Sequence, residues 1–512
     1  MGDQLKEKTA QSLMWGGVNN GGMQVLSLLA GIVMLRLLTP ADWGLVGMLA
    51  IFSAIAGNLQ SSGFSTALVN ERDPQPEQYN SVFWFNTLCS FAIYLLLCAA
   101  APLIARFFHQ PELVWLSRVI FLSFFFSSFG IATNAYMTKH LMMREQAIVA
   151  LTSLIVSSAV GIAMALAGMA YWSIAVQQVC FALLSAVGRF YYVPWRPRWG
   201  FSLAFIRQSF GFSMKILVTT IVNSINQNLL TIVLGRLFRS PRVVGNFFQA
   251  YKWDQMAFQT VSGMLAQVAQ PVIVTVKDDG DRERRVFRKM LRFTALLSFP
   301  VLFGLSMVSE EFIVVTIGTK WIDCVPLLAI LAVGGAFMPF YTLYQQLVIS
   351  HGRSDLNMWL GILQVAGQLG AVYASHRYGI TAMVVAFTAF TVGWLGVWVV
   401  CGRAVLRVRL RDAAADMLPF LAVAAAALTA AYFLTRPIAG LALGPRLTAP
   451  DGTQLPSYLT LLLLLVARIV AAATLYYGML RLLHVQILSE CMQFAKQKFS
   501  NLERKSSENN PS

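Results

Sequence analysis

Long stretches of the chain contain no charged residue, and their lengths limit what the sequence can fold into. Most are close to or above the roughly 20 apolar residues that an α-helix needs to cross a bilayer. Charged residues make up only 12% of the 512 residues, against about 25% in a soluble domain. We therefore expect an all-α polytopic membrane protein. The stretches without Asp, Glu, Lys or Arg are 9–35, 43–70, 78–105, 119–138, 146–188, 216–235, 255–276, 293–309, 324–350, 378–402 and 417–435.

These stretches and the turn residues between them predict about fourteen transmembrane helices. The run 146–188 is long enough for two crossings, with a turn at 168–171. Beyond the last crossing, residues 481–512 are expected to form an amphipathic cytoplasmic tail. The expected helices are 11–36, 41–66, 80–105, 113–137, 146–167, 170–191, 206–234, 242–274, 291–315, 325–349, 356–376, 379–402, 416–435 and 456–480.

Lys and Arg gather in alternate loops, and this pattern predicts the orientation of the chain. Loops on the cytoplasmic side carry an excess of Lys and Arg. The basic clusters at 277–292 and 403–411 and the basic tail therefore place both termini in the cytoplasm. The net charge of +16 is spread over several short loops, which indicates orientation rather than nucleic-acid binding. The six cysteines and five histidines show no metal-ligand spacing, so we expect no metal site and no cofactor.

A short motif occurs twice, about 200 residues apart. The first copy runs from Ile32 through Arg36, Pro40 and Gly44, and the second repeats this order from Ile232. In the second copy Arg236, Pro241 and Gly245 take the corresponding places. Each copy connects the outer end of one expected helix to the start of the next. Six helices precede the second copy, so the repeat predicts two six-helix bundles followed by two extra helices, an arrangement typical of transporters with internal repeats.

At this point the chain resembles a known family. The opening SLMWGGVNNGGMQVLSLLAGIVMLRLLTPADWGLVGMLAIFSAIAGNLQSSGFSTALV and the later QNLLTIVLGRLFRSPRVVGNFFQAYKW are similar to the polysaccharide transporters (O-antigen, colanic acid and teichuronic acid flippase type) of the multidrug/oligosaccharidyl-lipid/polysaccharide (MOP) flippase superfamily. The resemblance implies a V-shaped arrangement of two bundles around a central cavity. The helix count and the repeat place the N-terminal bundle at 1–195, the C-terminal bundle at 196–405, two additional helices at 406–480 and the tail at 481–512.

The same resemblance implies a function. Members of the family move undecaprenyl-diphosphate-linked oligosaccharide from the cytoplasmic to the periplasmic leaflet of the inner membrane by alternating access. The implied partners are the lipid-linked oligosaccharide, membrane lipids, and the glycan polymerase and chain-length proteins of the same pathway. No catalytic residue is expected.

Polar side chains form a stripe on each of two consecutive expected helices, and each stripe contains one lysine. On a helical wheel of 100° per residue each stripe covers about 80°. Lys215 is about 13 Å from the inner end of its helix, at 1.5 Å per residue. Because a buried charge is costly in lipid, we expect these stripes to line a wet, cationic cavity that binds diphosphate and sugar. The candidate substrate-binding residues are Lys215, Thr219, Asn223, Asn226, Gln249, Lys252, Gln259 and Gln267.

Three further residues are candidates for other roles. Asp254 is the one acidic residue that the predicted helix limits place deep in the membrane, on the face opposite Lys252. An intramembrane carboxylate can bind a coupling H⁺ or Na⁺ ion, or can pair with a basic group on another helix. Arg36 and Arg236 hold matching places in the repeated motif, where each is either part of a gate or part of a repeated structural turn.

Other functions remain open at this point. A multidrug exporter of the same superfamily is one alternative, although its cationic substrates call for acidic or aromatic groups and the two stripes are basic and amide-rich. A membrane glycan polymerase or ligase is another. The run Asp278-Asp279-Gly280-Asp281 contains the Asp-x-Asp spacing of a metal and nucleotide-sugar site. It lies in a short basic loop with no Rossmann-like strands around it, so a solvated charge run explains it better.

Overall fold

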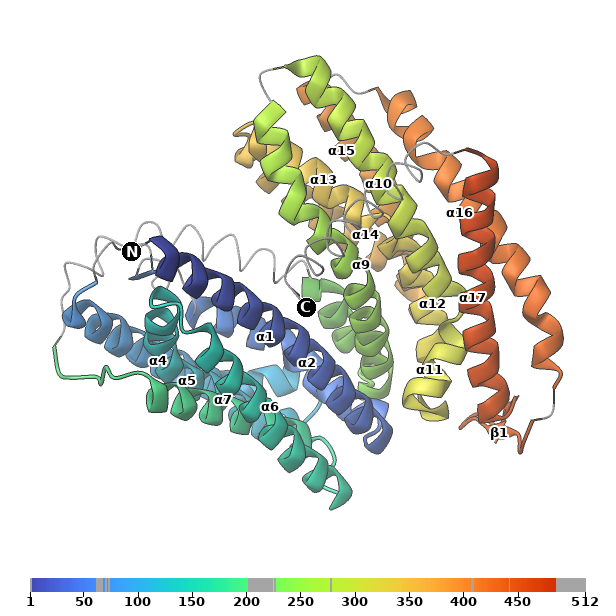
Figure 1. Cartoon of the computed structure of the whole chain (residues 1–512). Helices are drawn as coiled ribbons and strands as arrows, with labels where there is room; N and C mark the ends of the chain where they lie inside the picture. Colours follow the sequence, from blue (N-terminus) through green and yellow to red (C-terminus); the bar gives the residue numbers. More distant parts are fainter. Residues whose placement is uncertain are drawn as a thin grey trace, which may run out of the picture. The chain divides into compact units, whose positions relative to one another are not determined.

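The computed structural model is almost wholly helical (Figure 1). It describes residues 2–60, 68–69, 71, 74–200, 224, 227–276, 279–406, 409–441 and 443–484. The labelled helices are α1 (Gly2–Leu37), α2 (Pro40–Gln60), α4 (Pro76–Phe108), α5 (Leu113–Lys139), α6 (Met143–Leu166), α7 (Trp172–Tyr192), α9 (Pro241–Val276), α10 (Gly280–Met307), α11 (Ser309–Ile317), α12 (Cys324–Gly335), α13 (Met338–Ser350), α14 (Ser354–Ser375), α15 (Ile380–Leu406), α16 (Leu410–Ala439) and α17 (Tyr458–Leu482), with short 3₁₀ turns η1 (Thr319–Trp321) and η2 (His376–Tyr378).

The expected all-α membrane architecture is confirmed. Among the described residues ten helical segments are long and apolar enough to cross a membrane, and α12 and α13 together form one of them. A shorter apolar helix covers Pro40–Ile55. Helices also occupy the predicted ranges 242–274 and 356–376, as α9 and α14, and residues 227–238 at the end of the predicted range 206–234. The predicted turn at 168–171 is also confirmed, because α6 ends at Leu166 and α7 begins at Trp172.

The first compact unit comprises residues 1–248. In it α5 packs against α4 and α7, while α6 packs against α7 and α1. Local signals fix where the helices start. A proline opens α4, and the amide of Gln75 donates to Oε1 of Gln78 at 2.8 Å, so the helix entrance is capped by its own first turn. The helix at 227–238 and the first two turns of α9 also belong to this unit.

The second compact unit comprises residues 249–512. Its core gathers apolar side chains of α9, α10, α13, α15 and α16, with Phe287, Phe299, Phe340 and Trp398 fully buried. The two C-terminal helices, α16 and α17, lie side by side (Figure 1), and α16 also packs along α10. A two-residue antiparallel hairpin, β1 (Leu447–Thr448) with β2 (Gln454–Leu455), interrupts the connection between α16 and α17.

The helices α10 and α16 begin earlier than the sequence predicts, as does α1, which starts at Gly2 instead of near 11. The basic segment expected to be a loop at 277–292 is helical from Gly280, because Asp279 caps the helix by accepting from the amide of Arg282 at 3.0 Å. The helix α16 starts at Leu410 instead of near 416, with the side chain of Asp412 accepting from the amide of Arg409 at 3.2 Å. Both limits were misplaced because the apolar criterion ignores charged first turns.

The early helix starts allow ion pairs between α10 and α16. Asp416, with 1% of its side chain exposed, accepts from Nε of Arg288 at 2.6 Å and from Nε of Arg292 at 2.6 Å. One turn nearer the helix starts, Arg284 pairs with Asp412 at 2.7 Å. These bonds give the buried carboxylate of Asp416 its hydrogen-bond donors, and they hold α16 against α10 within the second unit.

Candidate functional site

The first predicted polar stripe lies outside the described residues. Lys215, Thr219, Asn223 and Asn226 all fall in the segments 201–223 and 225–226, which the structure does not describe. Their role in substrate binding therefore stays a prediction.

The second predicted stripe lies on α9. Gln249 is 1% exposed, Lys252 is half-buried and Gln259 is exposed. The backbone of Gln267 is helical, as expected. The opposite side of α9 is apolar and enters the core of the second unit through Val261, Leu265, Ala269 and Ile273. Lys252 and Gln259 therefore lie on the side of α9 away from this apolar core, whereas Gln249 is buried.

Asp254 lies on the core side of α9 and is 3% exposed. Its Oδ1 has no hydrogen-bond partner among the described residues. A Cβ placed on Gly335, at the end of α12, would lie 2.1 Å from this oxygen, so the carboxylate packs directly on the α12 backbone. A buried carboxylate oxygen without a donor is costly unless it binds a proton or a cation.

Arg236, in the second copy of the repeated turn, bonds to the end of α4. Its Nη1 donates to the carbonyl oxygen of Phe107 at 3.1 Å and lies 2.9 Å from Nδ1 of His109. Desolvation, and then the charges of Arg239 and Arg236, lower the pKa of His109, which keeps its ring neutral and able to accept from Arg236. Arg36 is exposed in the last turn of α1. The contacts of Arg236 are those of a structural connection between helix ends.

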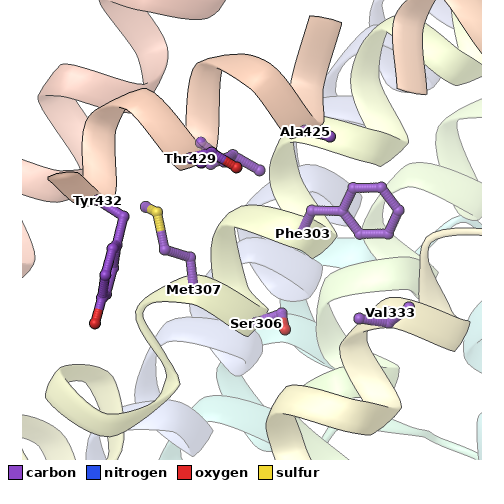
Figure 2. Close-up of a pocket in the computed structure, with 8 residues that line it drawn as sticks. Phe303, Ser306, Met307, Val333, Ala425, Thr429 and Tyr432 are labelled. Atoms are coloured by element: carbon purple, nitrogen blue, oxygen red, sulfur yellow. The ribbon is translucent and has the colours of Figure 1, made fainter. Parts of the chain in front are cut away.

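A cavity of about 390 Å³ lies in the second unit between α10, α12 and α16 (Figure 2). Its lining is mainly apolar and contains none of the predicted substrate-binding residues. The lining residues are Phe303, Ser306, Met307, Val333, Ala425, Leu428, Thr429 and Tyr432.

A buried ion pair adjoins this cavity, and the sequence did not predict it. Nη1 of Arg468 on α17 donates to Oε1 of Glu311 on α11 at 2.5 Å, with 8% and 4% of the two side chains exposed. The guanidinium also lies 4.7 Å from the ring centre of Tyr432. Glu311 is thus a further buried acidic residue besides Asp254, and it lies in the first turn of α11. Glu311 looks like a helix-end residue in the sequence, and its partner is 157 positions away.

No group of three His, Cys, Asp or Glu side chains that could hold a metal ion occurs within the described part of the chain. Asp279 and Asp281, of the Asp-x-Asp run, lie at the first turn of α10, where Asp279 is the cap. This placement gives Asp279 a structural role.

Comparisons with known proteins agree with the helical membrane fold. The profile of a family described as polysaccharide biosynthesis protein matches residues 33–326. The chain is 26% identical to the teichuronic acid biosynthesis protein TuaB of Bacillus subtilis, over 69% of this chain and 74% of TuaB. It is 22% identical to the succinoglycan biosynthesis transport protein ExoT of Rhizobium meliloti, over 70% of this chain and 72% of ExoT.

Two solved structures have a similar fold. The lipid II flippase MurJ, in an inward closed conformation, aligns with a TM-score of 0.65 at 12% identity, over 92% of this chain and 99% of MurJ. An inward-facing multidrug resistance MATE family transporter of the MOP superfamily aligns with a TM-score of 0.62 at 16% identity, over 75% of this chain and 94% of that one. At these identities the likeness shows the fold alone.

The helical fold and its membrane-spanning segments define the class: a multi-pass membrane protein with the fold of the MurJ and MATE structures. The matched profile covers more than half of the sequence, so the chain belongs to the polysaccharide biosynthesis protein family.

Proposed function

We propose that the protein moves an oligosaccharide linked through diphosphate to a polyprenyl lipid from the cytoplasmic to the outer leaflet of the inner membrane. The names of its relatives support this substrate class, since they belong to teichuronic acid and succinoglycan biosynthesis, and a structural neighbour is a lipid II flippase. The membership of the polysaccharide biosynthesis family favours this substrate over the cationic drugs of a multidrug exporter.

The polar face of α9 is the main structural support for this proposal. A charged side chain at the centre of a bilayer costs about 2.5–3.5 kcal/mol on insertion scales. Lys252 and Gln259 lie on the side of α9 opposite its apolar core face, so this side is better matched to water than to acyl chains. A lysine there supplies positive charge for a diphosphate, and the amide groups can bond to sugar hydroxyls. The predicted stripe of Lys215, Thr219, Asn223 and Asn226 would supply the same kinds of group.

We further propose an orientation with both termini in the cytoplasm, because the cytoplasmic side of membrane proteins is enriched in Lys and Arg. The exposed Arg282, Arg285 and Lys289 at the start of α10 then lie at the inner surface. In this orientation the lipid tail stays in the bilayer while the charged headgroup follows the polar surface across. Glycan polymerase and chain-length proteins of the same pathway would receive the product at the outer leaflet.

Deletion of the gene tests the function directly. We expect the lipid-linked oligosaccharide to accumulate on the inner leaflet, where a membrane-impermeant glycan-modifying reagent added to everted vesicles reaches it. Restoring the gene should return the oligosaccharide to the outer leaflet. Unchanged sidedness and amount of every lipid-linked glycan after deletion would exclude the proposed activity.

Asp254 gives a separate prediction about energy coupling. The change Asp254→Asn keeps the shape of the side chain but removes its ability to hold a proton or balance a cation. If Asp254 binds the coupling ion, we expect the change to reduce the stimulation of transport by an imposed H⁺ or Na⁺ gradient at least tenfold. The measurement is glycan flipping in reconstituted vesicles with and without the gradient.

The matched control is Asp355→Asn, because Asp355 is an exposed carboxylate in the first turn of α14. This control should keep the full response to the gradient. A response in the Asp254→Asn variant equal to that of the control would exclude Asp254 from coupling.

A further inference from the structure

The two copies of the repeated motif contact each other. Pro40 begins α2 and Pro241 begins α9, with a glycine four residues after each. A Cβ placed on Gly44 would lie 1.8 Å from the carbonyl oxygen of Pro241, and a Cβ placed on Gly245 would lie 1.7 Å from the carbonyl oxygen of Pro40. Both segments belong to the first compact unit. The first turns of α2 and α9 therefore cross backbone against backbone, and the contact is reciprocal.

Tight packing surrounds this crossing. One turn further along α2, a Cβ on Gly47 would lie 3.1 Å from the ring of Phe248. Val244 and Leu49 are fully buried there, and Met48 is 1% exposed. No larger residue than glycine fits at Gly44 or Gly245 unless the two helices separate.

A second contact holds the turn before α9 against the end of α4. Arg236 reaches the carbonyl oxygen of Phe107 and the ring of His109, as described above. Next to it, Nε2 of Gln110 donates to the carbonyl oxygen of Arg239 at 2.8 Å. These bonds join the end of α4 to the turn that precedes α9, so the second copy of the motif is fastened to the first unit at two places.

The chemistry of the crossing suits a contact that opens and closes. Glycine lets membrane helices approach closely, and the attraction then comes from van der Waals contact and weak Cα–H···O bonds. Such contacts are individually weak and need no side chains to interlock. The crossing also lies at the start of the helix that carries the polar stripe. Gln249 and Lys252 follow Gly245 by four and seven residues, or about 6 and 10 Å of helix.

We propose that the Gly44–Gly245 crossing is the outer latch of the transport path. This inference rests on the proposed function and orientation, which place both motif turns at the outer surface. The latch is closed in this structure. It opens when the first turns of α2 and α9 separate, which gives the polar face of α9 access to the outer side. The two glycines determine how closely the first turns of α2 and α9 can approach each other.

Valine substitutions test the latch. Gly44→Val and Gly245→Val each place carbon atoms where a carbonyl oxygen now lies, so both should hold the two helices apart. The matched controls are Gly57→Val in α2 and Gly393→Val in α15, because a Cβ at either position meets no atom within 4 Å. The control variants also replace a helix glycine with valine, but the added carbon atoms meet no neighbouring atom.

Opening is measured by the labelling of a buried position. Val244→Cys, made in a variant without the native cysteines, places a thiol at a fully buried site beside the crossing. A membrane-impermeant maleimide added to spheroplasts reaches this thiol only from the outer side. We expect Gly44→Val and Gly245→Val to raise the labelling rate about tenfold or more and to lower glycan export at least tenfold, while the controls change neither by more than twofold.

Two results would overturn the latch. One is export within twofold of normal when both valines are present. The other is unchanged labelling in the protein that remains in the membrane while export or protein amount falls, since that result describes a static joint. The labelling readout does not depend on the substrate, so the latch and the proposed function can fail separately.

Discussion

Replacing both Lys215 and Lys252 with glutamine is expected to reduce glycan export by about two orders of magnitude while the protein stays at its normal level in the membrane. A hydrogen bond to a charged group contributes about 1.5–3 kcal/mol, and about 1.4 kcal/mol corresponds to a tenfold change in binding. Each lysine that contacts the diphosphate should therefore contribute about tenfold or more. The measurement is the amount of glycan that reaches the outer leaflet, normalised to the transporter present.

Two matched variants serve as controls for this prediction. Lys252→Arg keeps the positive charge and should retain most of the export. Lys289→Gln removes a lysine from the exposed start of α10 and should leave export unchanged. Normal export in the Lys215→Gln, Lys252→Gln double variant would remove the proposed binding surface.

The second large effect concerns the ion pair between Glu311 and Arg468. Both side chains are almost fully buried, so removing one leaves a buried charge without its partner, which typically costs about 3–5 kcal/mol. We expect Arg468→Met to lower the free energy of unfolding in detergent by about this amount. The double change Glu311→Gln with Arg468→Met should recover most of the loss, because no isolated charge then remains.

The control for this prediction is Arg481→Met, at an exposed position near the end of α17. It should change the free energy of unfolding little, as surface positions usually do. Equal stability of Arg468→Met and this control would show that the ion pair does not hold α17 to α11. An additive double variant would show that the two side chains act independently.

The sequence predicted the helices well because long apolar runs report directly on membrane spans. It misplaced the starts of α10 and α16, where Asp279 and Asp412 act through local hydrogen bonds that a hydropathy pattern does not register. The charged first turns of these helices resemble loops in composition but are helical because they are capped and paired across to each other.

Contacts between residues far apart in the chain could not be predicted from the sequence. The repeated motif predicted two similar turns, but not that Gly44 and Gly245 would meet. Arg468 was visible as a charge midway along its helix, whereas Glu311 was not recognised as its partner. Helical periodicity did place Asp254 and Lys252 on opposite faces of α9, because that relation depends on the helix alone.

The proposed function requires water to reach the polar face of α9, and labelling of single cysteines measures this directly. Gln259→Cys and Lys252→Cys would be compared with Leu103→Cys on α4 and Val470→Cys on α17, which replace exposed apolar side chains on membrane-spanning helices. A water-soluble maleimide should modify both α9 positions at least tenfold faster than the two apolar positions. Labelling of both α9 cysteines as slow as that of the apolar pair would mean that this face meets lipid, and would contradict the account.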